Sequence, residues 1–186
     1  MIVSPYLQPL RKAHVYQGES NDCGPYSVTI VVNALRAMGI NPREMAQRMN
    51  RPRLRGGILV VRRIPNWATF PWGVADALKE CGLPARWRPL ADESTLARRL
   101  GNGEILLPII GEWRPKPWAH IAPLVAWDEQ KGWGFVDPLM PTSEVYWRPA
   151  GRFTRQWRAY FRTLVYIPSP LHSEEPLFST ISEPIA

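Results

Sequence analysis

The sequence predicts an α+β domain in which a helical N-terminal half precedes a C-terminal half of antiparallel strands. Up to about residue 101, apolar residues recur at helical spacing, whereas from residue 104 short apolar segments alternate with turn-forming residues. Helices in one part of a chain followed by strands in another are typical of α+β folds. Of the 186 residues, 45% are hydrophobic, which is enough for one sizeable core. We therefore expect residues 1–167 to form a single domain.

Four helices are expected in the N-terminal half. The first has Asp22 as its N-cap, and Gly39 suits the left-handed residue that ends many helices. The second has Asn41 as its cap and Pro42 at the first helical position. An arginine-rich loop at 51–57 follows it. The predicted helices cover 22–38, 41–49, 71–81 and 92–101.

Four apolar segments in the second half predict strands, with one more helix at 152–161 before the last strand. A turn at 129–132 makes the second and third strands a hairpin, which places Asp137 opposite Pro123 and leaves His120 offset along its strand. Sheet twist or a β-bulge must close that offset. Because Pro123 has no backbone N–H, it predicts an edge position or a local irregularity. The strands are expected at 104–111, 120–127, 132–138 and 162–167.

Residues 168–186 are expected to lie outside the domain as a Pro-rich acidic tail. The segment contains three glutamates and neither lysine nor arginine. A segment of this composition has little apolar surface to bury, so the sequence predicts a mobile tail.

The charge of the chain does not by itself indicate a nucleic-acid partner. The formal net charge is +7, and most of the 23 basic residues are arginines, which occur together with nine tryptophans. Basic grooves with stacking aromatics bind single-stranded nucleic acid. The arginines are, however, spread from Arg11 to Arg162 rather than gathered in one tract, so we expect a solvated basic surface and no nucleic-acid partner.

No targeting, membrane or metal-binding pattern is evident. The first thirty residues lack the order of a signal peptide, and the apolar runs are too short to span a bilayer, so a cytoplasmic location is expected. The two cysteines are expected to be free thiols, with Cys81 a buried packing residue at the end of a helix. The histidines lie far apart, so neither a metal ion nor another cofactor is predicted.

Cys23 is a candidate nucleophile because it lies at a helix N-terminus. There the unpaired backbone N–H groups and the positive end of the helix dipole favour a thiolate. A nucleophilic thiol also needs a base and a group that orients the base. His120 and Asp137, on adjacent strands of the predicted hairpin, could supply both. The alternatives are a packing cysteine, a hydrogen-bonded strand histidine and a turn aspartate.

The order of these residues resembles a known family. Gln17, the 22–25 segment with its following helix, His120 and the 136–138 segment resemble the bacteriocin-processing double-glycine peptidases of the papain superfamily. The resemblance spans nearly all of residues 10–167. It implies a papain-like fold, with the nucleophile helix in the N-terminal helical half and the antiparallel sheet in the C-terminal half.

The resemblance also implies a role for each of the four residues. Cys23 matches the nucleophile and His120 the general base and acid. Asp137 matches the residue that orients the imidazole, and Gln17 matches the donor that binds the oxyanion together with the Cys23 backbone N–H. Trp118, beside His120, could shield the base or contact substrate, and an ordinary core or rim position is the alternative.

The implied activity is cleavage of a peptide bond through an acyl-enzyme, and the family cuts leader peptides after Gly-Gly. Because the chain lacks a transmembrane region and a nucleotide-binding motif, we do not expect it to be a complete processing transporter, and a separate export transporter is a candidate partner. Acyl transfer or amidase chemistry by the same triad, and peptide binding without turnover, are the alternative functions. The Gly56-Gly57 pair looks like a cleavage site, but loop glycines more often supply a positive φ.

Overall fold

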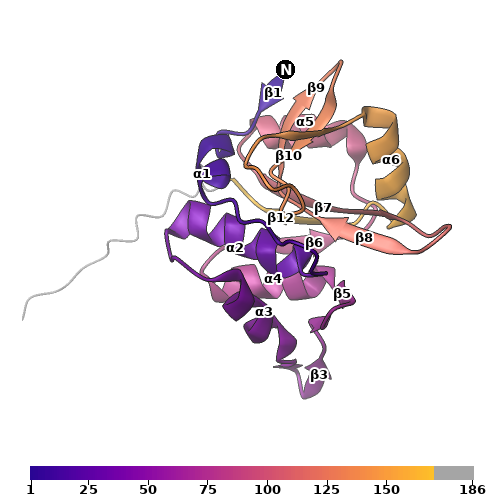
Figure 1. Cartoon of the computed structure of the whole chain (residues 1–186). Helices are drawn as coiled ribbons and strands as arrows, with labels where there is room; N and C mark the ends of the chain where they lie inside the picture. Colours follow the sequence, from indigo (N-terminus) through magenta and orange to yellow (C-terminus); the bar gives the residue numbers. More distant parts are fainter. Residues whose placement is uncertain (170–186) are drawn as a thin grey trace, which may run out of the picture.

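The computed structural model describes residues 1–169, except for the side chain of Arg55. The acidic tail predicted at 168–186 lies outside the described residues from position 170 onward. Figure 1 shows a large sheet between two groups of helices, with α2, α3 and α4 on one face and α5 and α6 on the other. The helices are α1 (Leu7–Lys12), α2 (Cys23–Arg36), α3 (Pro42–Asn50), α4 (Pro71–Glu80), the short 3-10 helix η1 (Glu93–Thr95), α5 (Leu96–Gly101) and α6 (Ala150–Ala159).

The main sheet is antiparallel throughout the described residues, with the order β11-β10-β9-β7-β12-β6. Two further strands join it, since β1 pairs with β9 and β8 pairs with β7. Its strands are β1 (Ile2–Val3), β6 (Arg86–Arg88), β7 (Ile105–Glu112), β8 (Trp118–Ile121), β9 (Leu124–Asp128), β10 (Gly132–Phe135), β11 (Tyr146–Arg148) and β12 (Leu164–Ile167). This architecture confirms the α+β class.

The core has two parts, one on each face of the sheet. Alternate residues of β7 face opposite ways, so Leu107 and Ile109 pack with α2, α3 and α4, whereas Leu106 and Ile110 pack with α5 and α6. Because both faces are covered, β7 is apolar at nearly every position and shows no alternation of polar and apolar residues.

The helices predicted at 41–49, 71–81 and 152–161 are confirmed within one or two residues, whereas the one predicted at 92–101 begins as the 3-10 helix η1 and is α-helical only from Leu96. The first predicted helix is confirmed within two residues as well, but the residues at its two ends act differently from the prediction. It stops at Arg36, and Ala37 rather than Gly39 is its left-handed terminal residue, with a φ of 51°. At its start, Asp22 makes no side-chain capping bond. Its carboxylate pairs with the buried guanidinium of Arg63 instead, because a buried charge needs an opposite charge beside it.

The loop predicted at 51–57 is wrong, because part of it forms a hairpin of strands β2 (Arg53–Arg55) and β3 (Ile58–Val60). Gly56 and Gly57 form its turn, both with the positive φ expected for loop glycines. A second small hairpin follows, made of β4 (Arg63–Ile64) and β5 (Ala68–Thr69). These short hairpins lie outside the main sheet.

The single strand predicted at 120–127 is also wrong, since the chain forms two strands, β8 and β9, with a break at Pro123. Both strands pair with β7. The irregularity predicted at Pro123 is therefore confirmed. The predicted β9–β10 hairpin is confirmed as well, with Trp127 opposite Trp133 and a register shift between Gly134 and Phe135. A shift of one residue closes only part of the predicted offset of His120, which lies in the separate strand β8 and pairs with β7.

Two helical glycines give a test of this packing. A Cβ at Gly73 in α4 would lie 2.2 Å from the backbone oxygen of Arg62, whereas a Cβ at Gly151 in α6 would meet no atom within 4 Å. We predict that Gly73→Ala lowers the free energy of unfolding by about 1–3 kcal/mol through overpacking. Gly151→Ala should leave it unchanged or raise it by up to about 1 kcal/mol, because alanine favours helices. Urea unfolding measures both, and a Gly73→Ala protein as stable as the wild type would contradict the close approach.

Candidate active site

A cavity of about 220 Å³ lies beside the N-terminus of α2. Its lining includes Cys23, the first residue of α2, together with His120 of β8 and Gln17 from the segment before the helix. Asp137, just after β10, contacts the imidazole of His120. The structure therefore brings together all four residues that the sequence singled out.

Cys23 occupies a position that favours a thiolate. α2 is fixed against β8 because Ser27 Oγ donates a hydrogen bond of 2.8 Å to the backbone oxygen of Ile121. Burial alone raises the pKa of the Cys23 thiol. Hydrogen bonds with the His120 side chain and with the backbone at Ile121 and Gly24, together with the charge of His120, outweigh burial and lower the pKa of Cys23 below its ordinary value.

Cys81 has the opposite character. Both cysteines are free thiols, as predicted, and Cys81 is buried at the C-terminal end of α4. Burial raises the pKa of the Cys81 thiol, an effect that the charge of nearby Arg48 only partly offsets. The two cysteines therefore differ in both position and acidity, and Cys81 serves as an internal reference for the reactivity of Cys23.

His120 lies in β8, opposite Ile110 of β7, and its side chain is buried. Its Nε2 lies 2.8 Å from Oδ1 of Asp137, which leaves Nδ1 for the thiol of Cys23. Burial alone lowers the pKa of His120, but the hydrogen bonds and charges of Asp137 and Cys23 raise the pKa to about 9. Both nitrogens are donors in an imidazolium, so these contacts suit the charged form.

Asp137 is buried as well, and its position follows from the turn after β10. Its Oδ1 also accepts the backbone N–H of Leu139 over 2.9 Å. Burial raises the pKa of the Asp137 carboxyl, but the hydrogen bond and charge of His120 outweigh burial and lower the pKa below its ordinary value. The carboxylate is thus suited to hold the imidazole in one orientation.

Gln17 reaches the site because its segment is tied to the turn that carries Asp137. The backbone N–H of Gln17 donates to the backbone oxygen of Pro138 over 2.8 Å, and His14 Nε2 lies 3.1 Å from the backbone oxygen of Asp137. The Gln17 side chain is buried, and its Nε2 donates to Ser20 O over 2.6 Å. Within residues 1–169, its Oε1 has no hydrogen-bond partner.

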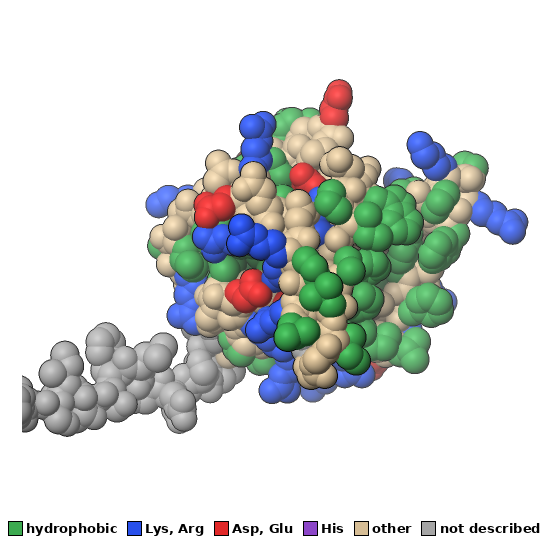
Figure 2. All heavy atoms as spheres, turned by 90° about the horizontal axis from the view of Figure 1, so that it is seen from below, with side chains coloured by type: hydrophobic (Ala, Val, Ile, Leu, Met, Phe, Trp, Pro, Cys, Tyr) green, Lys and Arg blue, Asp and Glu red, His purple; other side chains and the backbone are tan. Residues whose placement is uncertain are grey.

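The remaining walls of the cavity include several apolar side chains. Trp118 and Leu139 line it next to His120 and Asp137, and Trp67 lines it from the turn between β4 and β5. Trp118 keeps 36% of its surface exposed and is thus a rim residue rather than a core residue. Figure 2 shows hydrophobic side chains gathered on the side of the molecule that carries β5 and β8.

Sequence reasoning missed the contribution of the β4–β5 hairpin. Trp67 and Thr69 line the cavity, and Arg63 of the same hairpin pairs with Asp22, the residue directly before Cys23. The sequence offers no periodic pattern here, because each strand has only two residues. The one available signal is the pair Arg62 and Arg63, which directly follows an apolar run. Both arginines are buried, which is unusual for this residue type.

The described residues show neither a metal site nor a membrane span. Among residues 1–169, no three His, Cys, Asp or Glu side chains gather in a way that could hold a metal ion. The helices of this part of the chain are also too short or too polar to cross a membrane.

Comparisons with known proteins give structural neighbours only. No protein-family model matches the chain, and no curated protein is similar enough to match. A solved structure described as a C39-like peptidase from Bacillus anthracis is 11% identical, with a TM-score of 0.64, over 85% of this chain and 95% of the other. A double glycine motif protease from an AMS/PCAT transporter, solved in complex with the leader peptide, is 16% identical, with a TM-score of 0.53, over 84% and 91% of the two chains.

These neighbours confirm the fold that the resemblance implied. The two are described as a C39-like peptidase and a protease, the match covers most of each chain, and the helices and antiparallel sheet of residues 1–169 follow the same arrangement. The chain therefore has the same fold as this C39-like peptidase and this double glycine motif protease.

Proposed function

We propose that residues 1–167 act as a papain-like cysteine peptidase domain. The observation that carries the proposal is the buried hydrogen bond between His120 and Asp137, directly behind a thiol whose pKa is lowered and which lines a cavity. Nucleophile, base and orienting carboxylate in contact are the requirements for acyl transfer through a covalent intermediate. The C39-like fold supports the same reaction class.

In the first half of the reaction, the thiolate of Cys23 attacks the carbonyl carbon of a peptide and a tetrahedral oxyanion forms. Gln17 Nε2 has two hydrogens, of which Ser20 O accepts one. The second, together with the backbone N–H of Cys23, is available to bind the oxyanion. The imidazolium of His120 then gives its proton to the leaving amine as the C–N bond breaks, and a thioester with Cys23 remains.

In the second half, neutral His120 removes a proton from a water molecule, which attacks the thioester carbonyl. The C–S bond breaks, Cys23 leaves as a thiolate, and the imidazolium that His120 has become restores the resting ion pair. Asp137 stays ionised throughout and keeps the imidazole oriented. If an amine replaces water as the acceptor, the same steps give acyl transfer, so the chemistry of the acceptor decides between peptidase and transferase.

The substrate that we propose is a peptide in an extended conformation, with a leader peptide cut after Gly-Gly as the specific case. The support is that the double glycine motif protease with the same fold was solved in complex with the leader peptide. The apolar rim formed by Trp67, Trp118 and Leu139 suits a peptide rather than a charged ligand. A cytoplasmic location and a separate export transporter as partner are part of this proposal.

The reactivity of Cys23 tests the ion pair. We predict that iodoacetamide labels Cys23 of the wild type rapidly near neutral pH, because its pKa is lowered and that of His120 is raised to about 9. Below the pKa of Cys23 the thiolate becomes protonated, so the labelling rate should fall only as the pH drops below that pKa. His120→Gln should move the midpoint up towards about 8.5, the ordinary value for a thiol.

Intact-mass spectrometry across pH measures this labelling, and Cys81→Ala is the matched control. It should leave the adduct and its pH midpoint unchanged, because the buried Cys81 thiol has a raised pKa. Labelling that disappears in Cys81→Ala but persists in Cys23→Ala would refute the assignment of the nucleophile.

Gln17 separates peptide cleavage from thiol reactivity. Gln17→Ala should lower kcat for a peptide substrate by about 10²–10³, the usual loss when one oxyanion donor is removed. Alkylation by iodoacetamide forms no oxyanion, so the rate at Cys23 should stay within about twofold of the wild type. Gln130→Ala, in an exposed turn, is the control and should change neither rate. Equal losses in both assays would mean that Gln17 acts on the thiol and not on the oxyanion.

A further inference from the structure

The β4–β5 hairpin forms one wall of the cavity and belongs neither to α2 nor to the main sheet. Trp67, Ala68 and Thr69 line the cavity from this hairpin. Trp67 is 72% exposed, and Thr69 Oγ1 has no hydrogen-bond partner within residues 1–169. The exposed indole of Trp67 is a group that a bound peptide can contact, whereas the Thr69 hydroxyl oxygen is buried within the wall.

A hairpin with strands of two residues is not stable by itself, so it needs external anchors to act as a wall. Three contacts tie this hairpin to residues 21–24, the segment that leads into the nucleophile helix. They are the hydrogen bond of 3.1 Å from Asn21 Nδ2 to Asn66 O, the ion pair of Arg63 with Asp22, and the close packing of Thr69 on Gly24.

The Arg63–Asp22 pair is the strongest of these anchors. The Arg63 side chain is only 2% exposed, and it binds the carboxylate of the residue directly before Cys23. A charge-assisted hydrogen bond of this kind is roughly twice as strong as a neutral one. The pair also neutralises the carboxylate of the residue that directly precedes Cys23 in the chain, and an unpaired negative charge there would oppose the formation of a thiolate.

We propose that Arg63 is a positioning residue of this site, which holds the β4–β5 hairpin against the Cys23 segment and neutralises Asp22 beside the thiolate. The inference rests on the proposed peptidase function and adds a residue to it. Arg63 touches neither the thiol nor the imidazole, and it acts through Asp22 and the hairpin.

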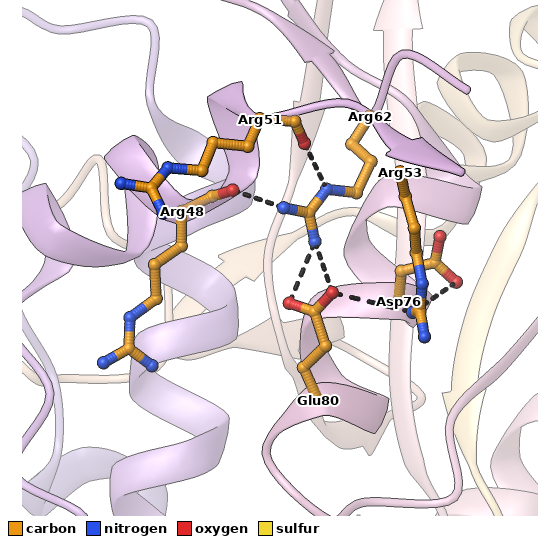
Figure 3. A network of polar contacts seen from close by, with 6 residues as sticks. All are labelled: Arg48, Arg51, Arg53, Arg62, Asp76 and Glu80. Carbon is orange, nitrogen blue, oxygen red and sulfur yellow. Dashed lines mark hydrogen bonds and ion pairs between the residues drawn. The ribbon is translucent and has the colours of Figure 1, made fainter. Parts of the chain in front are cut away.

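The neighbouring Arg62 provides a matched control. Its side chain is 5% exposed, as buried as that of Arg63, but it points towards the helical layer (Figure 3). It donates to the backbone oxygens of Arg48 and Arg51 and makes two hydrogen bonds, of 2.8 and 2.9 Å, to Glu80 of α4. Arg62 therefore stabilises the packing of α3 and α4 without contacting a residue of the candidate site.

The test compares Arg63→Met with Arg62→Met. The readouts are the pH midpoint of Cys23 alkylation by iodoacetamide and kcat/KM for a fluorogenic amide of Gly-Gly. Arg63→Met leaves Asp22 unpaired, so it should move the alkylation midpoint to higher pH and lower kcat/KM by about tenfold or more. Arg62→Met should lower the urea midpoint of unfolding and leave the alkylation midpoint unchanged.

A double variant separates charge from position. In Arg63→Met with Asp22→Asn both charges are absent, so the alkylation midpoint should return to the wild-type value while kcat/KM stays low. If Arg63→Met does not fold, Arg63→Lys carries the test, because it keeps the charge with poorer reach and geometry. For Arg63→Lys we expect the same alkylation midpoint as in the wild type, because the charge is kept, and a lower kcat/KM. A kcat/KM equal to that of the wild type would overturn the inference.

The outcomes distinguish this inference from the proposed function. If Arg63→Met and Arg62→Met give the same alkylation midpoint and the same kcat/KM, Arg63 is merely structural and the inference is overturned. If wild-type Cys23 itself titrates as an ordinary thiol, the proposed function fails, whatever the Arg63 variants do.

Discussion

The candidate site depends on the buried hydrogen bond between His120 and Asp137. The two side chains are 4% and 2% exposed, and neither could keep its charge at such depth without the other. The hydrogen bonds and charges of Asp137 and Cys23 raise the pKa of His120, and those of His120 lower the pKa of Cys23, so the geometry favours an imidazolium next to a thiolate. The pairing of β7 with β8 fixes His120, and Asp137 contacts it from the turn that follows β10.

The elements around this bond connect it to the rest of the cavity. The turn after β10 binds the Gln17 segment through the backbone, so the residue proposed for the oxyanion is placed by the same loop that places Asp137. The β4–β5 hairpin forms another wall of the cavity, and the ion pair of its Arg63 with Asp22 ties it to the start of α2. Cys23, His120 and the β4–β5 wall thus come from a helix, the main sheet and a separate hairpin, so the cavity exists only where these three parts pack together.

Much of this arrangement could be predicted from sequence because local signals dominate it. Capping and turn residues predicted the helices at Asn41 and at 71–81, and the turn at 129–132 predicted the β9–β10 hairpin that Asp137 follows. The ion pair of Arg63 with Asp22 could not be predicted, because it joins residues 41 positions apart on a hairpin with no periodic pattern. Because this partner could not be foreseen, the position of Asp22 directly before the helix predicted a capping side chain instead.

The ionisation of His120 is the most direct measure of this account. With three histidines in the chain, ¹⁵N-labelled imidazole signals can be assigned by substituting His14 and His172. We predict that both ring nitrogens of His120 carry protons at neutral pH, that the group deprotonates near pH 9, and that Cys23→Ala lowers this midpoint because the thiolate charge is lost. A His120 that is neutral at pH 7 and titrates with the same midpoint in Cys23→Ala would contradict the ion pair.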